Sequence, residues 1–202
     1  MGKFIGGIII GVLALAGGVY AYLHYGLFDM RADRPNGRLE MAYMNDAMDR
    51  YAGRHAPKVR NPLPLTDATL IGGIAVYKSN CAGCHGGPDM PESALGAGFN
   101  PPAPQFVKDA PDMPENQNYW IIRHGVKMTG MPAWEKVLAE SDIWKVTTFV
   151  GRMGELDKLS PAVQQAWKGS PAVAAPPASA EPAPGSEAAP RPAPTPEQRR
   201  GH

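Results

Sequence analysis

The pattern of hydrophobic and polar positions first separates an apolar amino-terminal segment from the rest of the chain. Residues 4–28 contain no Asp, Glu, Lys or Arg. A helix over Phe4–Tyr25 would be roughly 33 Å long, which is enough to cross a bilayer. The glycines of this segment would weaken a helix in water but are tolerated in membrane helices. Residues 1–28 are therefore predicted to form a transmembrane anchor.

A cleaved signal peptide is the alternative interpretation of this segment, because Ala14-Leu15-Ala16 resembles a small-residue cleavage site. The apolar run continues for nine residues beyond that point, and the charged region before it is very short. Both features favour an anchor, and either interpretation exports the chain.

Residues 29–66 are predicted to be a polar connector that contains one helix, Arg38–Arg54. One face of this helix is modestly apolar. It is expected to pack on the following domain or to lie at the membrane surface, with docking of a partner subunit as the alternative. Asn61-Pro62-Leu63-Pro64 then breaks helical structure. The helix has a modest apolar face formed by residues at every fourth position, namely Leu39, Tyr43, Ala47 and Tyr51.

Residues 67–157 have the pattern of a folded domain with three helices separated by loops rich in Gly and Pro. From Pro171 onward, by contrast, nine Pro and nine Ala occur in the last 32 residues, so residues 158–202 are predicted to be a disordered tail. The predicted helices are Thr66 or Asp67 to about Ser79, Pro114 and Glu115 to near Gly125, and a last one capped by Ser141 or Asp142 with Ile143, Val146, Phe149 and Val150 as its buried stripe.

The stretch Asn80-Cys-Ala-Gly-Cys-His-Gly86 carries the chemistry of this domain, because C-x-x-C-H is the spacing at which haem is attached covalently. Two residues between the thiols let one turn of backbone present both sulfurs to the vinyl groups at one porphyrin edge. The histidine that follows is then carried beneath the iron. Cys81 and Cys84 are the only two cysteines of the chain, so no thiol remains for a disulfide.

Two other kinds of site share part of this pattern. A thioredoxin-like C-x-x-C sits at a strand-to-helix junction, whereas a helix is predicted before Cys81. A zinc site needs further Cys or His at ligand spacing, and the remaining histidines form no such pair. Haem attachment is therefore the preferred interpretation.

The second axial ligand decides whether a haem iron carries electrons or binds an external ligand. The segment Ile122–Trp134 offers Met128, Met131 and His124 as candidates. A thioether ligand favours iron(II) and raises the reduction potential.

At this point the chain resembles the class I c-type cytochromes, in particular their small, membrane-anchored, single-haem bacterial members. The resemblance covers residues 67–157. It rests on Gly73, Tyr77 and Cys81 at four-residue intervals, Cys81-Ala-Gly-Cys84-His85, Thr129-Gly-Met131-Pro132, and Trp144 and Phe149 in the closing helix.

The resemblance implies a mostly α-helical fold of three to four helices wrapped around one haem c, in addition to the transmembrane helix. Cys81 and Cys84 would form the thioethers, and His85 would bind the iron. Met131 would bind the iron on the opposite side, because the sixth ligand in this family usually precedes a proline. Met128 is the runner-up for this position. Gly73 would let the first and last helices cross closely. Other expected haem-pocket residues are Tyr77, Pro102 or Pro104 with a carbonyl on the His85 ring, and Arg123 and Trp134 near the propionates.

The expected function is that of a membrane-tethered electron carrier, not an enzyme. Its donor would be a quinol-oxidising complex or a dehydrogenase, and its acceptor a terminal oxidase or reductase. A permanent subunit of a larger respiratory oxidoreductase is the first alternative, and an open-site haem sensor or small peroxidase the second. The formal net charge of +1 supports no nucleic-acid partner.

Covalent haem attachment takes place outside the cytoplasmic membrane, so the haem domain is expected on the periplasmic side of the bacterial inner membrane. Arg31, Arg34 and Arg38 follow the apolar segment, which is the opposite of the positive-inside tendency. The attachment motif outweighs this charge bias.

Overall fold

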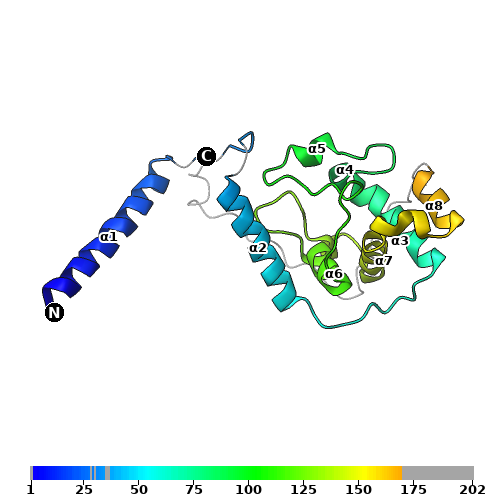
Figure 1. The fold of residues 1–202 in the computed structure, drawn as a ribbon, viewed down its shortest axis with the longest axis horizontal. Coiled ribbons are helices and arrows are strands. Elements are labelled where there is room, and N and C mark those ends of the chain that lie inside the picture. Colours follow the sequence, from blue (N-terminus) through cyan, green and yellow to red (C-terminus); the bar gives the residue numbers. More distant parts are fainter. Residues whose placement is uncertain (1, 28, 30, 35–36, 170–202) are drawn as a thin grey trace, which may run out of the picture.

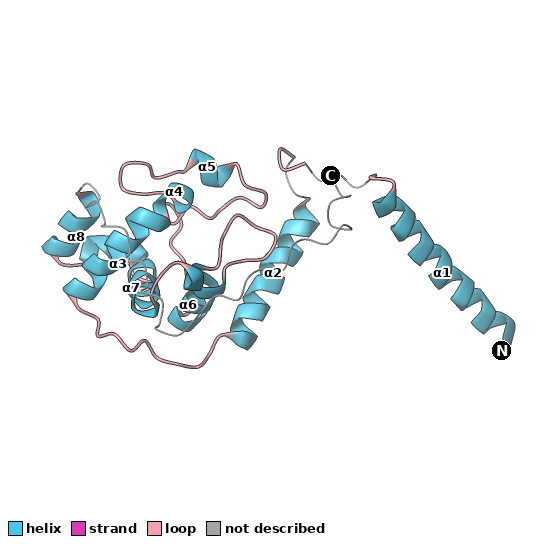
Figure 2. Ribbon diagram, turned by 180° about the vertical axis from the view of Figure 1, so that it is seen from behind, coloured by secondary structure: helices cyan, strands magenta, loops and turns pink. Residues whose placement is uncertain are grey.

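The structure is a computed structural model that describes residues 2–27, 29, 31–34 and 37–169. All regular structure in these residues is helical, and long loops join the helices (Figures 1 and 2). The predicted mostly α-helical fold is confirmed. The elements are α1 (Gly2–His24), α2 (Arg38–His55), α3 (Asp67–Asn80), α4 (Ala82–His85), α5 (Ala94–Ala97), α6 (Glu115–His124), η1 (Trp134–Lys136), α7 (Glu140–Val150), η2 (Met153–Lys158) and α8 (Pro161–Lys168).

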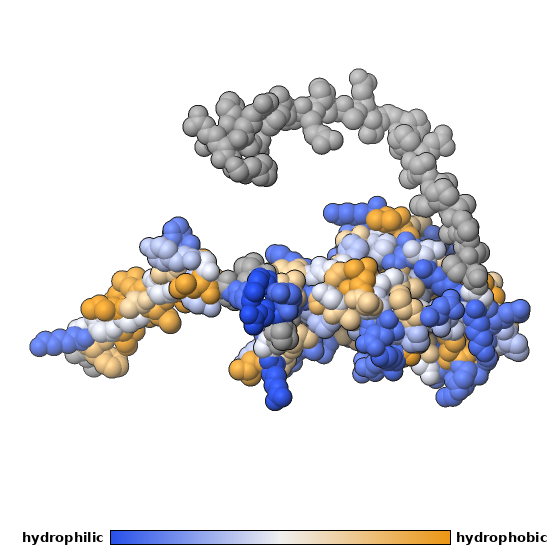
Figure 3. Space-filling model, turned by 90° about the horizontal axis from the view of Figure 1, so that it is seen from above, coloured by the Kyte–Doolittle hydropathy of each residue, from blue (hydrophilic) through white to orange (hydrophobic). Residues whose placement is uncertain are grey.

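Helix α1 stands apart from the packed part of the chain (Figure 1). None of its residues is buried, and its length and apolar composition suit a membrane span. The surface it exposes is largely hydrophobic (Figure 3). Exposed apolar side chains over a whole helix are stable in lipid rather than in water, so the predicted anchor agrees with the structure.

The core of the domain forms where α3 crosses α7. Gly73 makes this crossing possible, because a Cβ atom at Gly73 would lie 2.2 Å from the backbone oxygen of Lys145 and 2.8 Å from Cβ of Phe149. The rings of Tyr119 and Trp144 stack with their centroids 3.7 Å apart and join α6 to the same core. The close helix crossing expected from the resemblance is therefore present. The predicted stripe of α7, Ile143, Val146, Phe149 and Val150, is buried throughout.

The structure corrects two predicted boundaries. Helix α7 begins at Glu140, with Ala139 and not Ser141 or Asp142 at the cap position, because the Asp142 carboxylate pairs with Lys145 Nζ at 2.8 Å inside the helix.

The second correction concerns the tail predicted from residue 158. The chain continues into α8, which packs on α3 and buries Val163 and Trp167 in the core. The Ser160 hydroxyl caps this helix by accepting a hydrogen bond from the Val163 amide. The Pro/Ala-rich remainder lies outside the described residues.

Candidate haem-binding site

The attachment motif is a single helical turn that continues directly from α3. Cys81 ends α3 by donating its backbone N–H to the Tyr77 carbonyl at 2.7 Å, and the His85 amide donates back to the Cys81 carbonyl at 2.9 Å. Both thiols are free and half-buried on this turn. The structure therefore brings together two sulfurs and one imidazole on a short, rigid piece of backbone, which is the donor set that haem c requires.

The electrostatics of the Cys81 thiol argue against a dithiol redox site. Burial, with a smaller contribution from Cys84, raises the pKa of Cys81 to about 12. Redox-active C-x-x-C pairs have the opposite property, since their attacking thiol has a lowered pKa and is present as thiolate. No group of three or more Cys, His, Asp or Glu side chains placed to hold a metal ion occurs among the described residues, which likewise disfavours the zinc alternative.

The His85 ring is fixed on two sides. Its Nδ1 lies 2.8 Å from the backbone oxygen of Pro104, and its ring stacks on Phe106 with centroids 4.3 Å apart and planes 6° apart. Burial lowers the pKa of His85, an effect that the hydrogen bond to Pro104 partly offsets. A neutral imidazole that donates from Nδ1 keeps Nε2 free for a metal. Of the two prolines considered, the structure places Pro104 against His85.

Four successive carbonyl groups of the motif accept hydrogen bonds from side chains or backbone outside it. The buried Ser93 hydroxyl donates to Gly83, Gln105 Nε2 donates to Cys84 at 3.0 Å, and the Tyr77 hydroxyl donates to Gly86 at 2.9 Å. The fourth, that of His85, accepts from the Phe106 amide at 3.0 Å. The backbone of the motif is thus held in place by the protein itself. Tyr77 supports the motif from the core side, since its side chain is fully buried and its ring contacts those of Phe149 and Trp167.

Gln105 is a functional candidate that the sequence did not reveal. Its side-chain oxygen accepts from the Ser93 amide at 2.7 Å, while its Nε2 donates to Cys84 and also to Ala103 at 2.8 Å. It directly follows Pro104, whose carbonyl meets His85. A Gln in a proline-rich loop has no distinctive spacing, so only the fold identifies it as the link between the motif and this loop.

We expect Gln105→Ala to raise the haem reduction potential by on the order of tens of millivolts. Loss of these bonds loosens the Pro104 carbonyl, so the hydrogen bond to His85 Nδ1 weakens and the imidazole donates less charge to the iron. Potentiometric titration measures the shift. Gln164→Ala is the matched control, since Gln164 Nε2 also donates to two backbone oxygens, those of Asp157 and Leu159, at the start of α8. An unchanged potential in a fully haem-loaded Gln105→Ala protein would contradict the assignment.

The loop from Gly125 to Trp134 carries the candidate sixth ligands. Gly125 adopts φ +66°, and a Cβ there would lie 2.5 Å from the carbonyl carbon of Pro132, so glycine lets the loop fold back against the end of α6. The Val126 amide donates to the Met131 carbonyl at 3.2 Å, and the Thr129 hydroxyl donates to the Val126 carbonyl at 2.8 Å. This loop is therefore braced from within.

The three candidate ligands differ in their surroundings. Met131 is half-buried and packs against the same core as Cys81. Met128 is 81% exposed, and its backbone adopts φ +61°. The His124 ring contacts the Trp120 ring with centroids 4.0 Å apart and planes tilted by 58°, and its Nδ1 lies 3.5 Å from the Glu135 carboxylate. These environments favour Met131.

The two residues considered for the propionates are engaged within the protein. Arg123 donates to the Tyr119 hydroxyl at 2.8 Å and to the Glu135 carboxylate at 3.0 Å, and these bonds raise the pKa of Arg123. Trp134 starts η1 and packs half-buried on the core. Arg123 thus links α6 to η1, which follows the Met131 loop, and a role of either residue toward the propionates stays a prediction.

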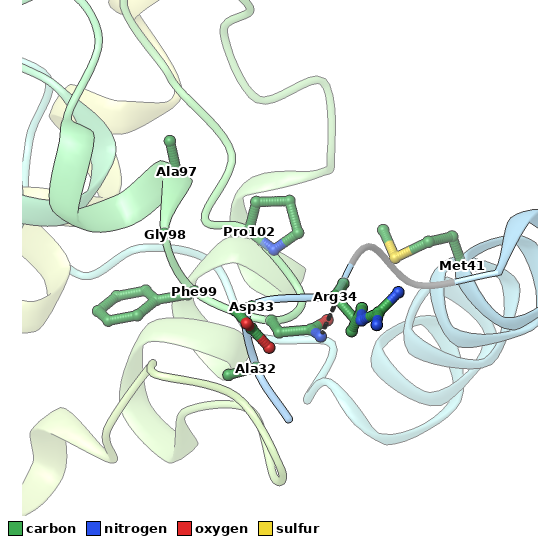
Figure 4. A pocket seen from close by; sticks show the side chains of 9 residues that line it. Ala32, Asp33, Arg34, Met41, Ala97, Gly98, Phe99 and Pro102 are labelled. Carbon is green, nitrogen blue, oxygen red and sulfur yellow. Dashed lines mark hydrogen bonds between the residues drawn. The ribbon is translucent and has the colours of Figure 1, made fainter. Parts of the chain in front are cut away.

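A separate pocket of about 490 Å³ lies between the connector and the loop 97–102, and Pro102 lines it (Figure 4). The Asn100 side chain donates to the Arg34 carbonyl at 2.8 Å across this junction. None of the thiols, His85 or Met131 borders the pocket, so it is distinct from the attachment site.

Comparison with known proteins gives one family match. The family described as cytochrome C oxidase, cbb3-type, subunit III, matches residues 68–150, a range that runs from the first turn of α3 to the end of α7. It contains both the attachment motif and the Met131 loop. Neither the curated proteins nor the solved structures gave a significant match.

Proposed function

Because the chain carries a class I c-type cytochrome domain that binds haem c covalently and serves electron transfer, we propose that it is a membrane-tethered periplasmic electron carrier with His85 and Met131 as axial ligands. The single observation that supports this most directly is the contrast between the half-buried Met131, packed on the core that holds Cys81, and the exposed Met128. A filled sixth position suits electron transfer, whereas catalysis at the iron needs an open one.

The residues of the chain do the positioning in this function. Cys81 and Cys84 would hold haem c through two thioether bonds, and the iron of the bound haem supplies one-electron chemistry. The Pro104 carbonyl holds the proton of His85 on Nδ1, and stacking on Phe106 fixes the plane of the imidazole ring, so the ligand does not reorient between oxidation states. Thr129 fixes Met131 by accepting from its amide at 3.1 Å. Rigid ligands on both sides keep structural reorganisation small.

A redox titration followed by optical spectroscopy tests the proposal, combined with exposure of the reduced protein to carbon monoxide. We expect a six-coordinate spectrum in both states, one single-electron transition and no rapid binding of carbon monoxide. Rapid binding without denaturation would instead support the open-site sensor or peroxidase alternative.

A permanent subunit of a larger oxidase is the second candidate, and the family description favours it specifically, since it names a subunit of a cytochrome oxidase. Purification in mild detergent at high salt separates the two candidates. A free carrier is expected to migrate alone. Co-migration with a partner at fixed stoichiometry would support the subunit and exclude the free carrier.

The proposed electron donor is a quinol-oxidising complex or a periplasmic dehydrogenase, and the proposed acceptor is a terminal oxidase or reductase. The anchor α1 supports this, since a tether to the membrane raises the effective concentration of the haem domain near such complexes.

A further inference from the structure

Helix α2 uses only part of its surface to contact the haem domain. Ala52 is fully buried, Met41 and Met48 are half-buried, and α2 lies against α6. Just after the helix, the Asn116 side chain donates to the Pro57 carbonyl at 3.1 Å. The connector is also bound to the domain before α2, through the bond from Asn100 to the Arg34 carbonyl. These contacts hold α2 against the haem domain on both sides of the helix.

A different side of α2 exposes an apolar stripe, which consists of Leu39, Tyr43, Ala47 and Tyr51. Tyr43 is two residues from Met41, a rotation of about 200° around the helix, so the middle of the stripe points away from the packed face, while Tyr51 lies nearer to its edge. Leu39, Tyr43 and Tyr51 are 76%, 74% and 52% exposed. The stripe is about 18 Å long, and among the described residues only His55 is recorded against one of its rings, that of Tyr51, with centroids 4.1 Å apart, so most of this apolar surface needs a cover.

Two observations identify the cover as the lipid surface. Only thirteen residues, 25–37, separate α1 from α2, so the start of α2 stays within roughly 50 Å of the end of the membrane span. Figure 1 shows α2 between α1 and the haem domain. Within this reach, contact between the stripe and lipid is an intramolecular event, for which even weak affinity suffices.

The chemistry of the helix agrees with an interfacial position. Tyrosine is enriched at membrane interfaces. Arg54 in the last turn of α2 and Lys58 and Arg60 just after the helix are exposed, and residues 50–60 contain no Asp or Glu to offset them, so this end suits anionic headgroups.

We propose that the stripe of α2 lies in the headgroup region of the membrane that α1 spans and so holds the haem domain in one orientation to the bilayer. The proposal requires the tether but neither the axial ligation nor the identity of the redox partners. A domain held this way presents the same face to every partner in the membrane plane.

The test uses the full-length, haem-loaded protein in oriented multilayers of phosphatidylethanolamine and phosphatidylglycerol, with no other protein present. Electron paramagnetic resonance of the ferric haem is recorded as the angle between the membrane and the field is varied. We expect strong angular dependence in the unmodified protein. The triple variant Leu39→Ser, Tyr43→Ser, Tyr51→Ser is expected to lose it.

The control is the double variant Leu65→Ser, Val137→Ser, which removes two exposed apolar side chains outside α2 and is expected to retain the angular dependence. Absence of angular dependence in the unmodified protein, its appearance only in native membranes, or its persistence in the triple variant would each overturn the proposal. Angular dependence that appears only in native membranes would assign the stripe to a protein partner. Spectra of frozen, unoriented samples report ligation separately, so a failure of the Met131 assignment is distinguishable.

Discussion

Replacing Met131 with alanine is expected to lower the haem reduction potential by on the order of 200 mV, because axial ligands set haem potentials over a range of about 0.8 V. The thioether stabilises iron(II), and its removal leaves a five-coordinate or misligated iron. We also expect the reduced variant to bind carbon monoxide rapidly. Potentiometric titration and optical spectra of the purified, full-length protein measure both effects.

Met128→Ala is the matched control. It removes the same type of side chain three residues before Met131, at a position that is 81% exposed. Its potential and spectrum are expected to match those of the unmodified protein. If instead Met128→Ala produced the large shift and Met131→Ala did not, the two ligand assignments would have to be exchanged.

The parts of the fold that depend on regular spacing could be predicted from the sequence. The stripe Ile143, Val146, Phe149 and Val150 repeats with the helical period, and all four side chains are buried. Cys81, Cys84 and His85 are linked by their spacing along the chain, and they lie on one turn of helix. These features are local, because their geometry follows from a few consecutive residues.

The features that could not be predicted depend on contacts between distant segments. Gln105 matters because the fold brings it to the Cys84 carbonyl, 21 residues away. Helix α8 falls in the segment predicted as a tail from its Pro/Ala-rich composition; it has only eight residues, and its burial rests on Trp167 reaching Tyr77 and Phe149. The sequence of α8 carries helical signals, namely Ser160 and Pro161 at its start and Val163, Ala166 and Trp167 on one face, but a segment this short is stable only through tertiary packing.

Gly73 illustrates how one position couples the fold to the site. It lies one turn before Tyr77, whose hydroxyl supports the Gly86 carbonyl of the attachment motif, and two turns before Cys81. The crossing at Gly73 therefore sets where α3 delivers the motif. A shift of α3 against α7 would move the thiols and His85 together relative to the Met131 loop.

Gly73→Ala is expected to destabilise the domain by about 3 kcal/mol or more, at the upper end of what overpacked substitutions cost. The added Cβ would lie 2.2 Å from the Lys145 backbone oxygen, and backbone cannot move aside as a side chain can. The helices must separate, which also loosens the packing of Tyr77 on Phe149. Denaturant unfolding of the full-length protein in detergent, followed by circular dichroism and haem absorbance, measures the loss.

The neighbouring substitution, Gly72→Ala, separates steric conflict from helix propensity. Its Cβ would approach only the flexible Lys145 side chain, at 3.1 Å from Cδ, which can shift. Alanine is better than glycine in a helix by up to about 1 kcal/mol, so Gly72→Ala is expected to leave the free energy of unfolding unchanged or to raise it slightly. Equal losses in the two variants would mean that the close approach of α3 and α7 is not confined to Gly73. A loss confined to Gly73→Ala, together with a changed reduction potential, would show that this helix crossing positions the haem-binding motif.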